Sequence, residues 1–92
     1  MRVRFYIDPE TGRPHIEEHG VGVAECVEAL DRATQDFAGS QGARLAYGPT
    51  NAGRILKVVY REGDSPNEVF VITAFPLRGK ELKAYRRRIR RK

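Results

Sequence analysis

The cationic side chains of this 92-residue chain are concentrated at its C-terminal end, and they are its strongest chemical signal. Residues 78–92 contain nine Lys or Arg and one Asp or Glu, a balance of +8, whereas residues 1–77 contain eight and eleven, a balance of −3. Clustered cations neutralise phosphates and release counterions. A charge so polarised predicts a polyanionic partner, most simply nucleic acid, with an acidic protein or an anionic membrane surface as alternatives.

Both histidines lie in one segment, His15-Ile16-Glu17-Glu18-His19, which matches the H-x-x-E-H pattern of an inverted zinc-protease motif. A hydrolytic zinc site also needs a third protein ligand, a second long helix that holds it and a cleft for a peptide. The segment between Pro14 and Gly20 is shorter than two helical turns, so we predict neither a metal nor a cofactor. His19, at the end of such a helix, is either a packing residue or a proton donor and acceptor in a groove.

The sequence lacks other catalytic signatures. No Gly-x-Ser-x-Gly or Cys-centred motif accompanies the histidines, and no Gly-Lys-Ser/Thr follows the segment Gly48–Gly53. Cys26 falls on the apolar stripe of an expected helix and is interpreted as a small core residue. The N-terminus lacks the apolar core of a signal peptide, and no stretch is long enough to span a membrane. These features favour one cytoplasmic domain over residues 1–92 and leave the oligomeric state open.

Two strands, Arg54–Arg61 and Glu68–Phe75, are expected to form the centre of the structure. Both are rich in β-branched and aromatic residues, and the turn Glu62-Gly63-Asp64-Ser65-Pro66-Asn67 joins them. Apolar residues occupy both the odd-numbered and the even-numbered positions of each strand, so they point to both faces of the hairpin. This predicts that both faces are covered.

The flanking segments predict short helices, further strands and a terminal helix. Val3–Ile7 is either an added strand or a loose arm, and Pro14–His19 is expected to be a short helix that ends at Gly20. A second helix is expected from Val23 to about Arg32. Two shorter strands, Thr34–Ala38 and Arg44–Gly48, precede the central pair and would complete an antiparallel meander.

The last helix is expected to begin near Leu77, with Leu82, Tyr85 and Ile89 on its buried stripe. Tyr85 is either a core residue or a group that stacks on or hydrogen-bonds to a nucleotide. On a helical projection most of the cations gather within about a third of the circumference. The residues predicted to bind nucleic acid are those of this helix together with two from the central strand, namely Lys83, Arg87, Arg90, Arg91, Lys57 and Arg61.

The order and spacing of several short pieces resemble those of the BrnT toxins of bacterial toxin–antitoxin pairs, small relatives of the RelE-type ribonuclease fold. The resemblance implies an α+β fold with short N-terminal helices, a curved antiparallel sheet and a C-terminal basic helix. The matching pieces are Phe5, Asp8, His19-Gly20-Val21, the Glu25–Leu30 helix, Arg44, Gly48, Gly53-Arg54-Ile55-Leu56-Lys57-Val58-Val59-Tyr60, Ile72-Thr73-Ala74, Glu81 and Tyr85.

The same resemblance implies an endoribonuclease that acts without a metal on RNA, free or on the ribosome, until a cognate antitoxin binds it. In such a reaction the 2′-hydroxyl attacks the neighbouring phosphate, and the protein stabilises charge and moves protons. Candidates for charge stabilisation are Arg54, Lys80 and Arg86. His19 or Glu81 is the candidate base, with Tyr85 as orienting group or acid. The chain has Phe75 and Pro76 where the family pattern usually has arginines, and this favours the alternative of a non-catalytic nucleic-acid or ribosome-binding module.

Overall fold

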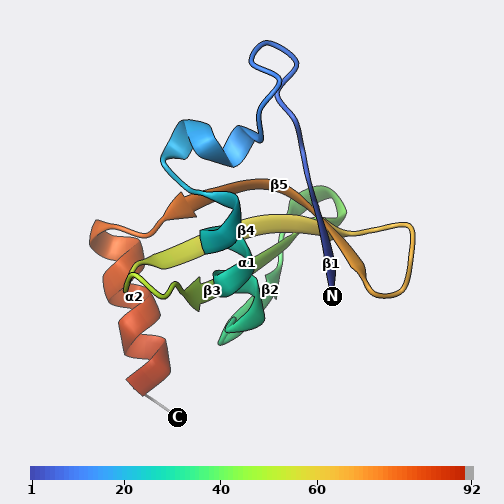
Figure 1. Ribbon diagram of the computed structural model, residues 1–92. Helices are drawn as coiled ribbons and strands as arrows, with labels where there is room; N and C mark the ends of the chain where they lie inside the picture. Colours follow the sequence, from blue (N-terminus) through green and yellow to red (C-terminus); the bar gives the residue numbers. More distant parts are fainter. Residues whose placement is uncertain (91–92) are drawn as a thin grey trace.

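Five strands form one mixed sheet in the order β1-β5-β4-β3-β2 in the computed structural model of the chain, which describes residues 1–90 (Figure 1). The chain is therefore α+β, as expected. Its elements are β1 (Arg2–Phe5), the 3₁₀ helix η1 (His15–His19), α1 (Val23–Asp31), β2 (Gln35–Ala38), the short 3₁₀ turn η2 (Ser40–Gly42), β3 (Arg44–Pro49), β4 (Ile55–Glu62), β5 (Glu68–Pro76) and α2 (Gly79–Arg90).

The predicted central hairpin is confirmed, with boundaries one residue from those expected. β4 is the middle strand and pairs antiparallel with β5. A β-bulge between Val59 and Tyr60 shifts their register by one residue, so that Lys57 lies opposite Phe75. Because side chains alternate between the two faces of a strand, this shift decides which side chains share a face.

The prediction of an antiparallel sheet is correct only for β2 to β5, which form the expected meander. β1 pairs parallel with β5, with Val3 opposite Val69, so the sheet as a whole is mixed. Val3 and Phe5 pack against the core, which explains why this segment is a strand rather than a loose arm. It ends at Phe5, earlier than the predicted Ile7.

One face of the sheet is covered by η1 and α1. Buried side chains of β4 and β5 pack there against Ile16, Val21, Cys26 and Ala29. Where α1 crosses β3, a Cβ at Gly48 would overlap the carbonyl oxygen of Ala29, so glycine is required for this close approach. The predicted core role of Cys26 is confirmed, and burial raises the pKa of its thiol to about 12.

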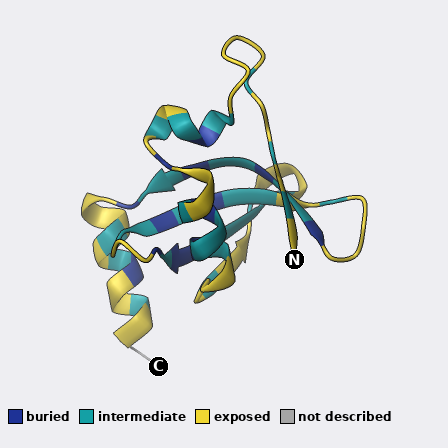
Figure 2. Ribbon diagram, in the orientation of Figure 1, coloured by how far each residue is buried: buried dark blue, intermediate teal, exposed yellow. Residues whose placement is uncertain are grey.

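The opposite face is covered at one end by α2, which packs through Leu77, Leu82 and Tyr85 onto Tyr47 and its neighbours. Tyr85 is 3% exposed, and its hydroxyl lies 3.0 Å from Thr34 Oγ1, so it is a core residue with a satisfied hydroxyl. Figure 2 shows the contrast between the buried segments of β4 and β5 and the largely exposed outer side of α2. Within residues 1–90, neither helix has the length and apolarity needed to cross a membrane.

Candidate nucleic-acid interface

The outer side of α2 is a basic surface. Because Leu82 and Tyr85 dock onto the sheet, the helix turns its cations to solvent. We call this surface the α2 basic face; its members, all exposed, are Lys80, Lys83, Arg86, Arg87 and Arg90. The remaining arginine of the helix, Arg88, points elsewhere: its Nε donates to Gln35 Oε1 at 2.6 Å. The predicted contact residue Arg91 lies outside the described residues.

Next to this face is a hollow of about 200 Å³ that three arginines line. Arg54 comes from the segment just before β4, Arg78 from the connection between β5 and α2, and Arg86 from α2 itself. Apolar side chains that include Ile55 and Leu82 form the rest of its wall. This arginine hollow therefore brings together two of the three predicted charge-stabilising residues, Arg54 and Arg86. Their third member, Lys80, is absent from the lining and is exposed on α2.

Arg54 also has a structural role that its sequence position does not reveal. Its Nε donates to Glu25 Oε2 at 2.8 Å, and its Nη2 donates to Glu25 Oε1 at 2.6 Å and to the Gly20 carbonyl at 2.8 Å. The Arg54 hydrogen bonds hold the pKa of the Glu25 carboxyl below its ordinary value. This bidentate pair fastens α1 and the segment before it to the start of β4. Glu25 thereby fixes the guanidinium and neutralises part of the charge at the hollow.

A second cluster surrounds the ring of Phe75 on β5. The ring centroids of His19 and Phe75 are 4.3 Å apart, and Lys57 Nζ lies 6.0 Å from the Phe75 centroid. Lys57 Nζ also donates to Glu81 Oε2 at 3.1 Å. These four residues, His19, Lys57, Phe75 and Glu81, are the Phe75 patch. It combines an aromatic surface on which a base can stack with an imidazole, an ammonium and a carboxylate that can exchange protons or contact a phosphate.

The predicted catalytic residues are thus distributed over four places. His19 and Glu81 lie in the Phe75 patch, Arg54 and Arg86 line the arginine hollow, and Lys80 lies on the α2 basic face. Tyr85 is inside the core, where its hydroxyl contacts Thr34 instead of a groove. Of the predicted contacts on β4, Lys57 belongs to the Phe75 patch and Arg61 is exposed towards the other end of the strand.

Two contributors were missed by sequence reasoning. Arg78 is not among the predicted site residues, although it directly precedes α2 and continues the i, i+4, i+8 row of Leu82 and Arg86 that lines the hollow. The second is Phe75, which the sequence analysis considers only as a position where an arginine is missing. Without the bulge at Val59/Tyr60, continued pairing would set Lys57 opposite Ala74, and Phe75 would occupy the other face. No sequence signal marked that bulge.

No family model, no curated protein and no solved structure matches this chain, so the site rests on its own residues.

Proposed function

We propose that this chain binds RNA through the α2 basic face and the arginine hollow. The observation that carries the proposal is their continuity: Arg86 belongs to both, and five exposed cations lie beside a hollow that two further arginines line. Such a surface neutralises successive phosphates and gains free energy from counterion release. Arginines in a concave site also offer bidentate contacts to one phosphate.

The Phe75 patch favours single-stranded RNA over a duplex. Pro76, which follows Phe75, lines the arginine hollow, so the hollow and the Phe75 ring lie at the same end of β5 and one RNA strand could contact both. A base can stack on an aromatic side chain only when it is free of its own stack, as in single strands, loops and ends.

A second candidate is cleavage of the bound RNA, as in a toxin-like endoribonuclease of RelE-like fold that a cognate antitoxin neutralises in the cytoplasm, acting on free or ribosome-bound RNA. The specific support is that His19 and Lys57 both lie beside the Phe75 ring and that Glu81 pairs with Lys57. In this reaction His19 accepts the proton of the 2′-hydroxyl while its oxygen attacks phosphorus, and Lys57 stabilises the phosphorane-like transition state. The bond between phosphorus and the 5′-oxygen breaks, and the leaving oxygen takes a proton from water, giving a 2′,3′-cyclic phosphate and a 5′-hydroxyl. The resemblance to BrnT toxins supports the same candidate.

The test of binding is a salt series with a labelled single-stranded RNA. For the native chain we expect the affinity to fall steeply with salt. The double variant R86A/R87A removes two phosphate contacts, so the slope of log K against log salt should become shallower by about 0.7 per contact. R32A is the control for loss of a cation elsewhere on the surface, because Arg32 is exposed at the end of α1 and its removal should leave the slope unchanged. A flat salt response, or equal effects of both variants, would overturn the proposal.

Cleavage is tested by mapping new ends in a labelled messenger RNA, with and without ribosomes. If the second candidate is right, cyclic-phosphate ends appear with the native protein and are lost with H19A. Y85F is the control that should still cleave, because the Tyr85 hydroxyl is buried against Thr34. RNA that stays intact in both conditions eliminates cleavage and leaves the binding proposal in place. Loss of cleavage with folded Y85F would contradict the placement of the chemistry at the Phe75 patch.

A further inference from the structure

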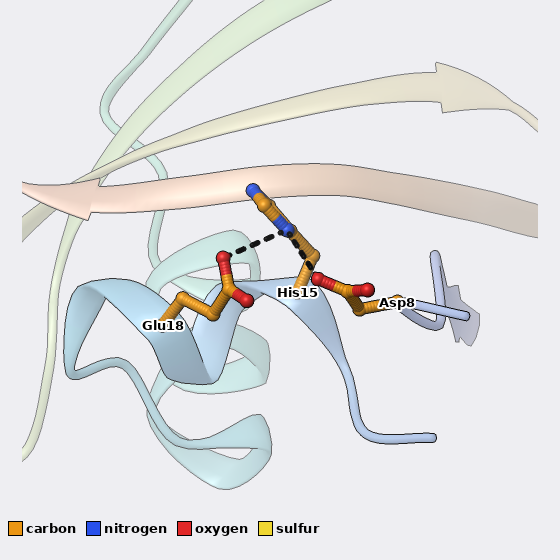
Figure 3. A group of neighbouring side chains, drawn as sticks. All are labelled: Asp8, His15 and Glu18. Carbon is orange, nitrogen blue, oxygen red and sulfur yellow. Dashed lines mark ion pairs between the residues drawn. The ribbon is translucent and has the colours of Figure 1, made fainter. Parts of the chain in front are cut away.

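Three potential metal ligands, Asp8, His15 and Glu18, meet on the N-terminal side of the molecule (Figure 3). One ligand atom from each lies within 4.8 Å of the others. His15 Nδ1 is 3.4 Å from Glu18 Oε2 and 3.7 Å from Asp8 Oδ2. The three come from two segments, the turn after β1 and the helix η1, so the cluster depends on the fold of this region and not on one sequence motif.

The turn that follows β1 fixes Asp8. Its amide donates to the Arg13 carbonyl at 2.9 Å, and its carbonyl accepts from Gly12 at 2.8 Å. Asp8 Oδ1 accepts from the Glu10 amide at 2.9 Å, which leaves Oδ2 directed at His15. The pKa of Asp8 lies below its ordinary value, mainly because of this Glu10 hydrogen bond and then because of the adjacent Glu18 side chain. One carboxylate oxygen therefore holds the turn while the other faces the cluster.

The 3₁₀ geometry of η1 aligns the other two residues. In a 3₁₀ helix, side chains three residues apart are eclipsed, so His15 and Glu18 lie on the same side. The H-x-x-E-H pattern in an α-helix would instead bring the two histidines together through their i, i+4 spacing. Here the two rings are in edge contact but His19 packs against Phe75, and Asp8 supplies the third ligand that the sequence alone did not reveal.

Within the described part of the chain, no Lys or Arg forms an ion pair with the carboxylates of this cluster. Among residues 1–90, the ion pairs of Asp8 and Glu18 are formed with His15 alone, while the nearby Arg13 pairs with Glu17 at 2.6 Å. Two adjacent carboxylates repel one another, and a single imidazole between them can carry at most one positive charge. A divalent cation would compensate both carboxylates.

We propose that Asp8, His15 and Glu18 bind a divalent first-row transition-metal ion of the Zn²⁺ class. Bonds of about 2.0–2.2 Å in tetrahedral geometry separate ligand atoms by about 3.3–3.6 Å, and the two distances from His15 Nδ1 are close to this spacing. Imidazole nitrogen with carboxylate oxygens suits Zn²⁺, whereas Ca²⁺ and Mg²⁺ prefer oxygen ligands only. Three protein ligands leave a fourth position for water or another group.

Such an ion would link the turn after β1 to η1. Ile16, the buried residue of η1, packs in the core beneath, and the rings of His15 and His19 are in edge contact at 5.3 Å between centroids. Metal binding would therefore fix η1 on the sheet and order the segment that carries His19. This inference does not depend on RNA binding.

The experiment is zinc titration of the untagged, chelator-treated full chain, followed by calorimetry and by thermal unfolding. We expect one Zn²⁺ per chain and a rise in the midpoint of unfolding, because a ligand that binds the folded state stabilises it. E18Q should weaken zinc binding by about tenfold or more, and H15A should abolish it. E17Q is the matched control on the same helix and should bind like the native chain. Mg²⁺ and Ca²⁺ should produce no shift.

Absence of saturable zinc uptake by the folded native chain would overturn the proposal. So would equal losses in E17Q and E18Q, which would indicate only a general effect of negative charge. A third contrary result is loss of binding in H19A with full binding in E18Q, since that would identify the two histidines as the ligands. Because E18Q removes only a charge from a half-exposed side chain, the test remains decisive even if H15A fails to fold.

Discussion

The two ends of the chain are attached to the sheet by different kinds of contact. α2 docks through an apolar group centred on Tyr85, and all its outward cations project into solvent. η1 buries only Ile16, and polar contacts from the preceding turn and from His15 hold the rest of this region. An apolar seam tolerates any charge on its outer side, so α2 is free to present a binding surface. The N-terminal region instead uses its polar groups to hold itself together.

The largest effect should come from truncating the apolar seam of α2. Y85A removes a ring that is 3% exposed together with its hydrogen bond to Thr34, and should lower the free energy of unfolding by about 3–5 kcal/mol. I89A is the control on the same stripe: because Ile89 is 36% exposed, it should cost about 1 kcal/mol or less. Urea denaturation measures both. Equal losses would show that α2 is not anchored through Tyr85.

The difference between the two ends also explains what could be predicted from sequence. A helix needs only its 3.6-residue period to sort apolar from cationic side chains, so the α2 basic face was predictable residue by residue. The central strands were equally predictable, because their composition and length leave few alternatives. The parallel pairing of β1 was not, since alternation shows which face is buried but not which strand lies beside it.

The grouping of the site depends on backbone details that no local pattern encodes. The bulge between β4 and β5, where Ile72 of β5 is the extra residue, decides that Phe75 and Lys57 share a face, and the 3₁₀ form of η1 decides that His15 pairs with Glu18. The ion pair between Arg54 and Glu25 joins residues 29 positions apart and exists only because α1 crosses the start of β4. These contacts result from the packing of the complete fold, so no short stretch of sequence predicts them.

A smaller effect is expected at that ion pair, which ties the N-terminal half to β4. E25Q should cost about 1 kcal/mol at neutral pH, since the pair is partly exposed to solvent. The pKa of Glu25 is lowered in the folded protein, so its contribution is present above the pKa of the unfolded chain and disappears as the pH falls through the folded value. The gap between native and E25Q stabilities should therefore begin to narrow near the pKa of an unfolded glutamate, about 4.3, and close as the pH falls through the lower folded value. A gap that stays constant from neutral pH to the acid end of the folded range would show that the charge is irrelevant.

The smallest effect tests whether the two ends open independently. Cys26 and Ile16 belong to the core under η1 and α1, whereas Tyr85 belongs to the core under α2. Burial raises the pKa of the Cys26 thiol to about 12, so alkylation of this thiol in the closed protein is negligible. I16V and Y85F should each cost about 1 kcal/mol globally, so they are matched in stability. If the N-terminal side opens locally, I16V should raise the rate of Cys26 alkylation about fivefold, and Y85F should leave it within about twofold. Equal acceleration of alkylation in both variants would mean that the two cores open as one cooperative unit. The different attachments of α2 and η1 would then not make either end of the chain open by itself.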